Sequence, residues 1–315
     1  MAFAGAMAVA MVMDALVGWP GALLARIGHP VTWLGRLIAA LDTQWNREMD
    51  APSLRRTTGI AAALLVIALA AGFAWIVQRM IPAGLIGIVI LGILAWPFVA
   101  FRSLYDHVAA VRDPLRAGDV EAARKQVAMI VGRDPSKLDE AGIARAAIES
   151  LSENASDGIV APIFWGALFG LPGIVGYKAI NTLDSMIGHR SERHRFFGWA
   201  AARIDDVANF LPARLTGLLF VVLAGSTQRS QALSCMWQEA RHHRSINAGW
   251  PEAAMAGALG VRLCGPRFYD DELADEPWLN GAAGDPAAAD ITKALELYVA
   301  AMFALTLLLV VLAVV

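Results

Sequence analysis

Apolar stretches long enough to cross a membrane alternate along this chain with polar blocks. Residues 59–77, 81–101 and 297–315 carry no charged side chain, and each can cross a hydrocarbon core of roughly 30 Å. The apolar N-terminus contains Asp14 and lacks the basic start of a secretory signal, so it predicts a further span near residues 2–24. The pattern predicts an all-α, polytopic helical membrane protein, folded as a single integral membrane domain over residues 1–315.

Two further apolar stretches are interrupted by helix breakers. Residues 158–177 are uncharged, but they contain Pro162, Pro172 and several glycines, which favours a broken or re-entrant segment over a straight helix. Residues 207–225 form a weaker candidate, because Pro212 and Arg214 lie near their start.

The polar blocks indicate how the chain is oriented in the membrane. They cover residues 26–58, 102–157 and 227–293, and the first two are rich in Lys and Arg. Positively charged loops favour the cytoplasm, so the N-terminus is expected outside. The second block predicts two amphipathic cytoplasmic helices. One covers residues 119–131, and the other starts at Asp134 and Pro135 and runs through Ser152.

The side on which residues 178–206 lie depends on the interrupted segments. If 158–177 and 207–225 both span, this basic loop lies outside; if neither does, every polar block after Arg102 is cytoplasmic. We favour the second arrangement, which predicts a multi-pass protein of the cell (inner) membrane with a cytoplasmic active site, because ATP is available there.

Composition supports a membrane protein and excludes some partners. Hydrophobic residues make up 57% of the chain, charged residues 17%, and the mean hydropathy is +0.52. A net charge of −2 argues against nucleic acid as a partner. The two cysteines, Cys235 and Cys264, lack metal-ligand spacing and are interpreted as reduced thiols.

A run of carboxylates leads into the first interrupted segment. Glu149, Glu153 and Asp157 are spaced by four residues, so on a continuous helix they form one stripe, with Asn154 beside it. Like charges repel, and a divalent cation that carries phosphates would turn this stripe into a binding site. The alternative is a solvated helix face that ends in a cap at Gly158.

Three more polar runs lie at apolar boundaries. Asn181, Asp184 and Gly188 share a helix face, and Ser185, His189 and Arg190 lie beside them, which suits magnesium and phosphate. The alternative is an interfacial helix capped by its own basic residues.

The third run contains Asp205, Asp206, Asn209 and Arg214, where either magnesium-phosphate binding or pairing with Arg203 or Arg214 would offset the adjacent carboxylates. Asn247 belongs to the fourth run, which suits an anion, a carboxamide or a simple turn. The chain has no Walker-type phosphate loop and no Gly-x-Gly-x-x-Gly motif, so a nucleotide needs another design.

These runs, in this order, resemble the CobD/CbiB family of cobalamin biosynthesis, the adenosylcobinamide-phosphate synthases. The matching segments are Asp14, His29–Ile38, Val131–Asp134, Glu149–Asp157, Tyr177–His189, Ala201–Arg214 and Asn247–Pro266. The chain departs from the family pattern at Gly18-Trp19-Pro20, where the family has Gly-Asp-Pro, and at Ser245-Ile246-Asn247, where it has Ser-Pro-Asn.

The resemblance implies an enzyme that joins adenosylcobyric acid to (R)-1-aminopropan-2-ol or its O-phosphate through an amide, with ATP and Mg²⁺. Membrane lipids are expected neighbours, and a homo-oligomer or other late cobamide-synthesis enzymes are candidate partners. A lipid-diphosphate transferase or a transporter remains an alternative. Consumption of cobyric acid and an aminoalcohol phosphate, and not of a polyprenyl diphosphate, would exclude the transferase. Uptake without chemical change would support the transporter.

Within this reaction we assign hypothetical roles to the polar runs. The metal ligands are Asp157, Asp184, Asp205 and Asp206. The catalytic residues are Glu149, Glu153, Asp157, Asp184 and His189, with Glu153 or Glu149 as general base. The substrate-binding residues are Asn154, Asn181, Ser185, Arg190, Asn209, Arg214 and Asn247, and Trp165, Trp199 and Trp250 are candidates for the corrin wall.

Overall fold

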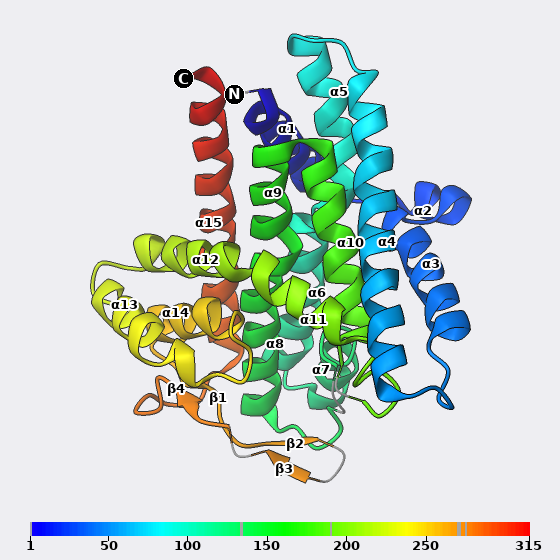
Figure 1. Cartoon of the computed structure of the whole chain (residues 1–315). Coiled ribbons are helices and arrows are strands. Elements are labelled where there is room, and N and C mark those ends of the chain that lie inside the picture. The colour runs from blue at the N-terminus through cyan, green and yellow to red at the C-terminus, as the bar shows by residue number, and fades with distance from the viewer. Residues whose placement is uncertain (1, 133–134, 190, 270–271, 275) are drawn as a thin grey trace. The chain divides into compact units, whose positions relative to one another are not determined.

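The computed structural model is almost entirely helical (Figure 1), and it describes residues 2–132, 135–189, 191–269, 272–274 and 276–315. The chain divides into two compact units, each built from separate stretches of sequence. The first contains Met1–Ala100, Ala161–Asn209 and Thr306–Val315, and the second contains Phe101–Val160 and Phe210–Leu305. The prediction of an all-α polytopic membrane protein is confirmed.

The first unit is a bundle in which the long helix α4 lies alongside α10 (Figure 1). Its elements are α1 (Ala2–Val17), α2 (Gly21–Ile27), α3 (Pro30–Trp45), α4 (Pro52–Arg79), α5 (Leu85–Ala95), the 3₁₀ turn η1 (Trp96–Phe98), α9 (Ala161–Phe169), α10 (Leu171–Ile187) and α11 (Trp199–Ala208).

Small residues allow the helices of this bundle to pack closely. Gly59, Ala62, Ala63, Val66 and Ala70 of α4 are buried in a core shared with α3, α10 and α11. The large apolar residues of α4 point outward instead, and they include Leu64, Leu69 and Phe73. Small residues at the helix contact and large ones outside are typical of a helix packed within a bilayer.

The second unit packs several short helices around α8. Its elements are α6 (Phe101–Arg116), α7 (Val120–Val127), α8 (Glu140–Ala155), the π-helical turn η2 (Ser156–Val160), α12 (Phe210–Leu223), α13 (Arg229–Gln238), the 3₁₀ turn η3 (Ala240–His242), α14 (Gly249–Leu259), and α15 (Ala288–Val314), whose last residues belong to the first unit. Two small antiparallel pairs complete it, β1 (Leu263–Cys264) with β4 (Trp278–Leu279) and β2 (Arg267–Tyr269) with β3 (Glu272–Ala274).

Among the described residues, three helices are long and apolar enough to cross a membrane: Pro52–Arg79, Leu85–Arg116 and Ala288–Val314. They contain the predicted span near 59–77 and most of those near 81–101 and 297–315. A fourth would exist if α11 and α12, which cover most of the predicted segment 207–225, formed one broken span.

The predicted break within residues 158–177 is confirmed. Helices α9 and α10 are separated at Gly170, whose φ of 71° lies in the left-handed region that glycine tolerates best. The amide of Leu171, at the start of α10, donates a hydrogen bond to the Gln78 side-chain oxygen at 2.7 Å. The chain therefore turns at Gly170 and α10 packs back against α9.

Two sequence-based helix boundaries are wrong. The span predicted near residues 2–24 ends at Val17, because Gly18 adopts a φ of 61° and Pro20 cannot continue a helical hydrogen-bond ladder. The helix expected to start at Pro135 starts at Glu140, where the Asp139 side chain caps it by accepting from the Gly142 amide. Asp134, the cap we predicted, lies outside the described residues.

Candidate active site

In the first unit, helix α10 delivers the Asn181–Gly188 run as a single face. Gly188 caps the helix, and its amide donates to the Asp184 carbonyl at 2.7 Å. The Asp184 side chain lies so close to Gly188 that a Cβ atom there would overlap the carboxylate. Burial raises the pKa of Asp184, and the negative charge of Asp206 raises it further, against the opposing charges of His189 and Arg203.

Helix α11 brings the Asp205–Asn209 run to the same unit. The Asn209 amide nitrogen donates to Asp205 Oδ2 at 2.9 Å, and the Tyr177 hydroxyl donates to Asn209 Oδ1 at 2.8 Å. Asp206 forms an ion pair with Arg203 at 2.9 Å. Pairing with Arg203, the alternative we kept for these carboxylates, is therefore realised at Asp206.

A polar pocket of about 690 Å³ opens beside this run. It is lined by Gly188, His189, His194, Arg195, Trp199, Ala202 and Arg203. Its side chains include imidazole and guanidinium groups, which are suited to phosphate oxygens. Asp184 does not line the pocket, but its negative charge acts on His189, which does.

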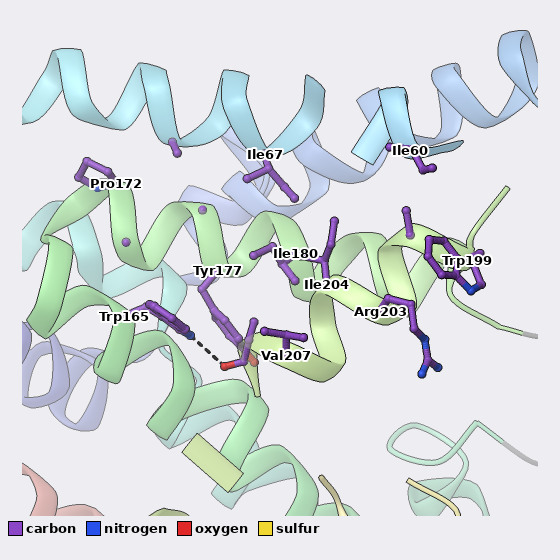
Figure 2. Close-up of a pocket in the computed structure, with 15 residues that line it drawn as sticks. Ile60, Ile67, Trp165, Pro172, Tyr177, Ile180, Trp199, Arg203, Ile204 and Val207 are labelled. Atoms are coloured by element: carbon purple, nitrogen blue, oxygen red, sulfur yellow. Dashed lines mark hydrogen bonds between the residues drawn. The ribbon is translucent and has the colours of Figure 1, made fainter. Parts of the chain in front are cut away.

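A second cavity, of about 670 Å³, shares Trp199 and Arg203 with the polar pocket. Figure 2 shows its wall, with Ile60 and Ile67 from α4, Trp165 from α9, Tyr177 and Ile180 from α10, and Ile204 and Val207 from α11. The Trp165 indole is fixed by donating to the Ala208 carbonyl at 3.0 Å. The guanidinium of Arg56 lies 3.7 Å from the ring centroid of Trp199. Two of the three predicted wall tryptophans therefore line one cavity.

In the second unit, the carboxylate stripe is not continuous. The α-helix ends at Ala155 and the π-helical turn η2 follows, so Asp157 leaves the four-residue spacing that relates Glu149 to Glu153. A π-turn carries more residues per turn, and the prediction of one regular stripe through Asp157 is wrong for this reason. Glu149 is buried and accepts the Cys264 amide at 2.7 Å, whereas Glu153 is exposed.

Arg214 and Asn247, both predicted to bind substrate, contact each other in the second unit. Arg214 Nη1 donates to Asn247 Oδ1 at 2.8 Å, and the guanidinium lies over the ring of Trp250, 4.5 Å from its centroid. Other predicted side chains bond locally: Asn154 donates to the Ser150 carbonyl, Ser185 to the Asn181 carbonyl, and Asn181 accepts from Lys178. Arg190 lies outside the described residues.

Comparison with known proteins identifies the family. The family model described as "CobD/Cbib protein" matches residues 7–298. The chain belongs to the CobD/CbiB family. A "Cobalamin biosynthesis protein CobD" from Rhodobacter capsulatus is 61% identical over 98% of this chain and 96% of its own length. A protein of the same name from Brucella suis is 46% identical over 95% of this chain and 94% of its own length. Another, from a Sinorhizobium species, is 46% identical over 87% of this chain and 87% of its own length. No solved structure matches the chain.

Sequence reasoning missed part of what this CobD/CbiB chain brings together. His194, Arg195 and Arg203 line the polar pocket, and none of them was predicted to bind substrate, although Arg203 was considered as an ion-pair partner. The excess of basic residues in 178–206 was the available signal. The second omission is a group in the second unit that consists of the half-buried His243 and the buried Glu252 and Cys264. The sequence spacing of these three residues matches no known metal-ligand motif, so the sequence gives no signal for this group.

Proposed function

We propose that the protein forms the amide between a propionate of adenosylcobyric acid and (R)-1-aminopropan-2-ol or its O-phosphate, using ATP and Mg²⁺. Membership of the CobD/CbiB family supports the coarser statement that the chain is an enzyme of cobalamin biosynthesis. The substrates and cosubstrates are our proposal, and they are the ones that the resemblance of the polar runs to this family implies.

The observation that carries this proposal is the pair of adjoining cavities in the first unit. A corrin has a broad apolar face and ionisable edges, and its partners carry phosphate. The aromatic and aliphatic cavity suits the ring face, and the basic pocket, which shares Trp199 and Arg203 with it, suits a phosphate. In Figure 2 the Arg203 guanidinium points away from the isoleucines, as a group that serves the polar side would.

The residues of the first unit also fit a magnesium ion. Asp184 is half-buried beside Asp206, and the negative charge of Asp206 raises the pKa of Asp184, so a divalent cation bound by these carboxylates would offset their repulsion. Asp205 is one residue away and is held by Asn209. When bound, the ion would neutralise charge on the transferred phosphate.

The reaction needs a leaving group on the propionate, since a carboxylate is a poor electrophile. In our scheme a carboxylate oxygen attacks the γ-phosphorus of ATP and ADP leaves; the amine then attacks the acyl carbon and phosphate leaves. His189 and Arg195 hold phosphate oxygens in the polar pocket. The ammonium proton needs a base, for which Glu149 and Glu153 of the second unit are our candidates.

The test is amidation by the purified full-length protein in detergent. Cobyric acid, ATP, Mg²⁺ and either amine should give an amidated corrin by mass spectrometry, with one ADP formed per amide. Asp184→Asn should lower the rate by about 100-fold or more. Glu192→Gln, at an exposed carboxylate of the same unit that lines neither cavity, should keep the wild-type rate.

Other substrates separate the alternatives in the same assay. Turnover of a polyprenyl diphosphate without amidation would identify a lipid-diphosphate transferase. An unmodified corrin together with uptake into proteoliposomes would identify a transporter. Full amidation by Asp184→Asn would refute the metal assignment while leaving the reaction in place.

A further inference from the structure

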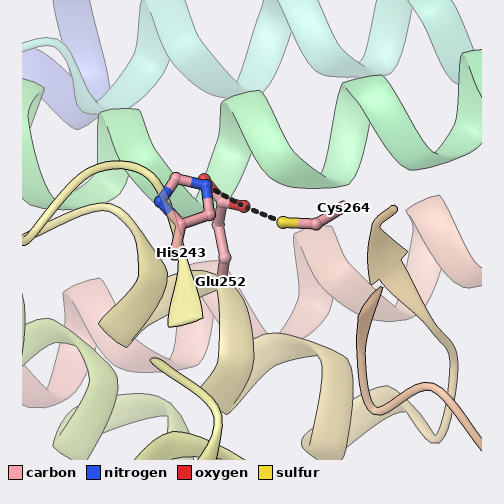
Figure 3. Close-up of side chains that lie close together, drawn as sticks. All are labelled: His243, Glu252 and Cys264. Carbon is pink, nitrogen blue, oxygen red and sulfur yellow. Dashed lines mark hydrogen bonds and ion pairs between the residues drawn. The ribbon is translucent and has the colours of Figure 1, made fainter. Parts of the chain in front are cut away.

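A half-buried histidine, a buried glutamate and a buried cysteine converge in the second unit, and none of the three has been given a role in amidation. His243 follows η3, Glu252 lies on α14 and Cys264 lies on β1. The Cys264 thiol is 3.1 Å from Glu252 Oε2, His243 Nε2 is 3.6 Å from the same oxygen, and all three ligand atoms lie within 4.8 Å of one another. Figure 3 shows the imidazole and the thiol on either side of the carboxylate.

These separations fit a bound metal ion. Tetrahedral zinc takes nitrogen and oxygen ligands at roughly 2.0–2.2 Å and sulfur at about 2.3 Å, which separates neighbouring ligand atoms by about 3.3–3.7 Å. The Nε2–Oε2 separation of 3.6 Å falls within that range, and the Sγ–Oε2 separation of 3.1 Å is slightly shorter. The thiol and the imidazole lie within 4.8 Å of each other, so side-chain rotations would bring all three ligand atoms around one ion.

Neighbouring groups hold each ligand in place. The Ser245 amide donates to His243 Nδ1 at 3.0 Å, and the Ser245 carbonyl lies 3.2 Å from the same nitrogen, so the backbone holds this side of the ring while Nε2 faces Glu252. The backbone of Cys264 adopts a φ of 60°, which is uncommon for a residue with a side chain, and its amide is fixed by Glu149. From this position on β1 the Cys264 thiol reaches Glu252.

We propose that His243, Glu252 and Cys264 form a three-ligand site for a divalent transition metal of the zinc class. Imidazole nitrogen and thiolate sulfur favour Zn²⁺, Co²⁺ and related ions, whereas Mg²⁺ prefers oxygen ligands and water. Glu252 and Cys264 are 3% and 2% exposed, so a cation here would offset the cost of burying a carboxylate and a thiolate. Three protein ligands leave a fourth position for water or another ligand.

The test uses Co²⁺ as a spectroscopic probe on the full-length protein, purified with a chelator and transferred to chelator-free detergent buffer. One equivalent of Co²⁺ should produce the intense visible bands of a tetrahedral ion together with a cobalt–thiolate charge-transfer band. Zn²⁺ should abolish both bands stoichiometrically, and a large excess of Mg²⁺ should leave them. Elemental analysis should find one zinc per chain after zinc loading.

Matched variants locate the signal. Cys264→Ser should remove the charge-transfer band and weaken binding by at least about 100-fold, and Glu252→Gln should weaken binding while retaining the band. Cys235→Ser is the control, because Cys235 is the other buried cysteine of this unit and contacts Gln231. An unmodified protein that gives no tetrahedral cobalt spectrum overturns the proposal whatever the variants do. Loss of the charge-transfer band in Cys235→Ser, with the band retained in Cys264→Ser, overturns it as well.

Discussion

At the scale of single residues, the Asp184 carboxylate depends on the absence of a side chain at Gly188. A Cβ atom at that position would overlap Asp184 Oδ1. We therefore expect Gly188→Ala to turn the carboxylate out of its position and to lower the amidation rate by about 10-fold or more, because a displaced metal ligand no longer meets its ion. The rate is measured with saturating Mg²⁺ and again over a Mg²⁺ titration, where the half-saturating concentration should rise.

Gly72→Ala is the control for this substitution. Gly72 lies within α4 of the same unit and has open space where a Cβ would be added, so alanine there should keep the rate and raise helix stability by about 0.5–1 kcal/mol. Equal rates for Gly188→Ala and Gly72→Ala would mean that Asp184 has no positional role in the reaction.

Local spacing explains which site residues the sequence could predict. Asp205 and Asn209 are one helical turn apart and do bond to each other, and Asn181 and Asp184 do share a face of α10. In contrast, the Cys264 amide meets Glu149 across 115 positions of sequence. No helical or strand period relates residues at such a distance, so this contact requires the tertiary fold.

At the scale of secondary-structure elements, the turn at Gly170 sets how α9 and α10 pack. Alanine at the Gly170 backbone angles, φ 71° and ψ −144°, costs about 1–3 kcal/mol, and its Cβ would also overlap the Gln78 oxygen that accepts from Leu171. We expect Gly170→Ala to lower the free energy of unfolding by about 2 kcal/mol, measured by thermal or denaturant unfolding in detergent. Gln78→Ala should reproduce only the hydrogen-bond share, about 1 kcal/mol.

A second element-scale contact links α3 to the chain after α10. Burial alone would raise the pKa of Asp42, but hydrogen bonds from Asn46 and Arg193, with the positive charges of Arg193 and His194, bring it below its ordinary value of 3.8. A lowered pKa in the folded state means that this stabilisation is complete above about pH 4 and is lost as the pH falls through the folded pKa.

The matching measurement compares wild type with Asp42→Asn. The wild type should lose thermal stability between about pH 4 and pH 2, and the variant should start less stable and lose less over the same interval. Parallel pH profiles for the two proteins would show that Asp42 is not linked to the acid transition.

Element boundaries were predictable where a local signal exists and not elsewhere. The proline and glycine content of 158–177 predicted a break in the helix, and the break occurs at Gly170. The π-turn at Ser156–Val160 has no such signal, because an extra residue in a helix is accommodated by packing against neighbours such as α12. The prediction of a regular four-residue spacing from Glu149 through Asp157 was therefore wrong at Asp157.

At the scale of the whole molecule, hydropathy predicted the spans because a membrane helix is apolar on every side: large apolar residues face the lipid, and small ones pack against neighbouring helices. Helix α4 illustrates this: it extends over 28 residues, or about 42 Å, and buries its small residues while exposing Leu64, Leu69 and Phe73. The pattern does not reveal that the chain divides into two units, since each unit is assembled from stretches that are distant in sequence.

The orientation of α4 remains a prediction, and single cysteines can test it. Met49 precedes α4 and is 98% exposed, while Ala83 lies in the exposed turn after it. Because the arginine-rich block 26–58 favours the cytoplasm, Met49→Cys should react with a membrane-impermeant maleimide only in inverted vesicles, and Ala83→Cys only in intact, right-side-out ones.

The native thiols should not obscure this experiment. Cys235 and Cys264 are buried, and burial, with the charge of Glu239, raises the pKa of Cys235 to about 11, so little thiolate forms at neutral pH. Wild-type protein is labelled in parallel to measure the background. Labelling of both introduced cysteines from one side would mean that α4 does not cross the membrane, and the reverse sidedness would place residues 26–58 outside the cell.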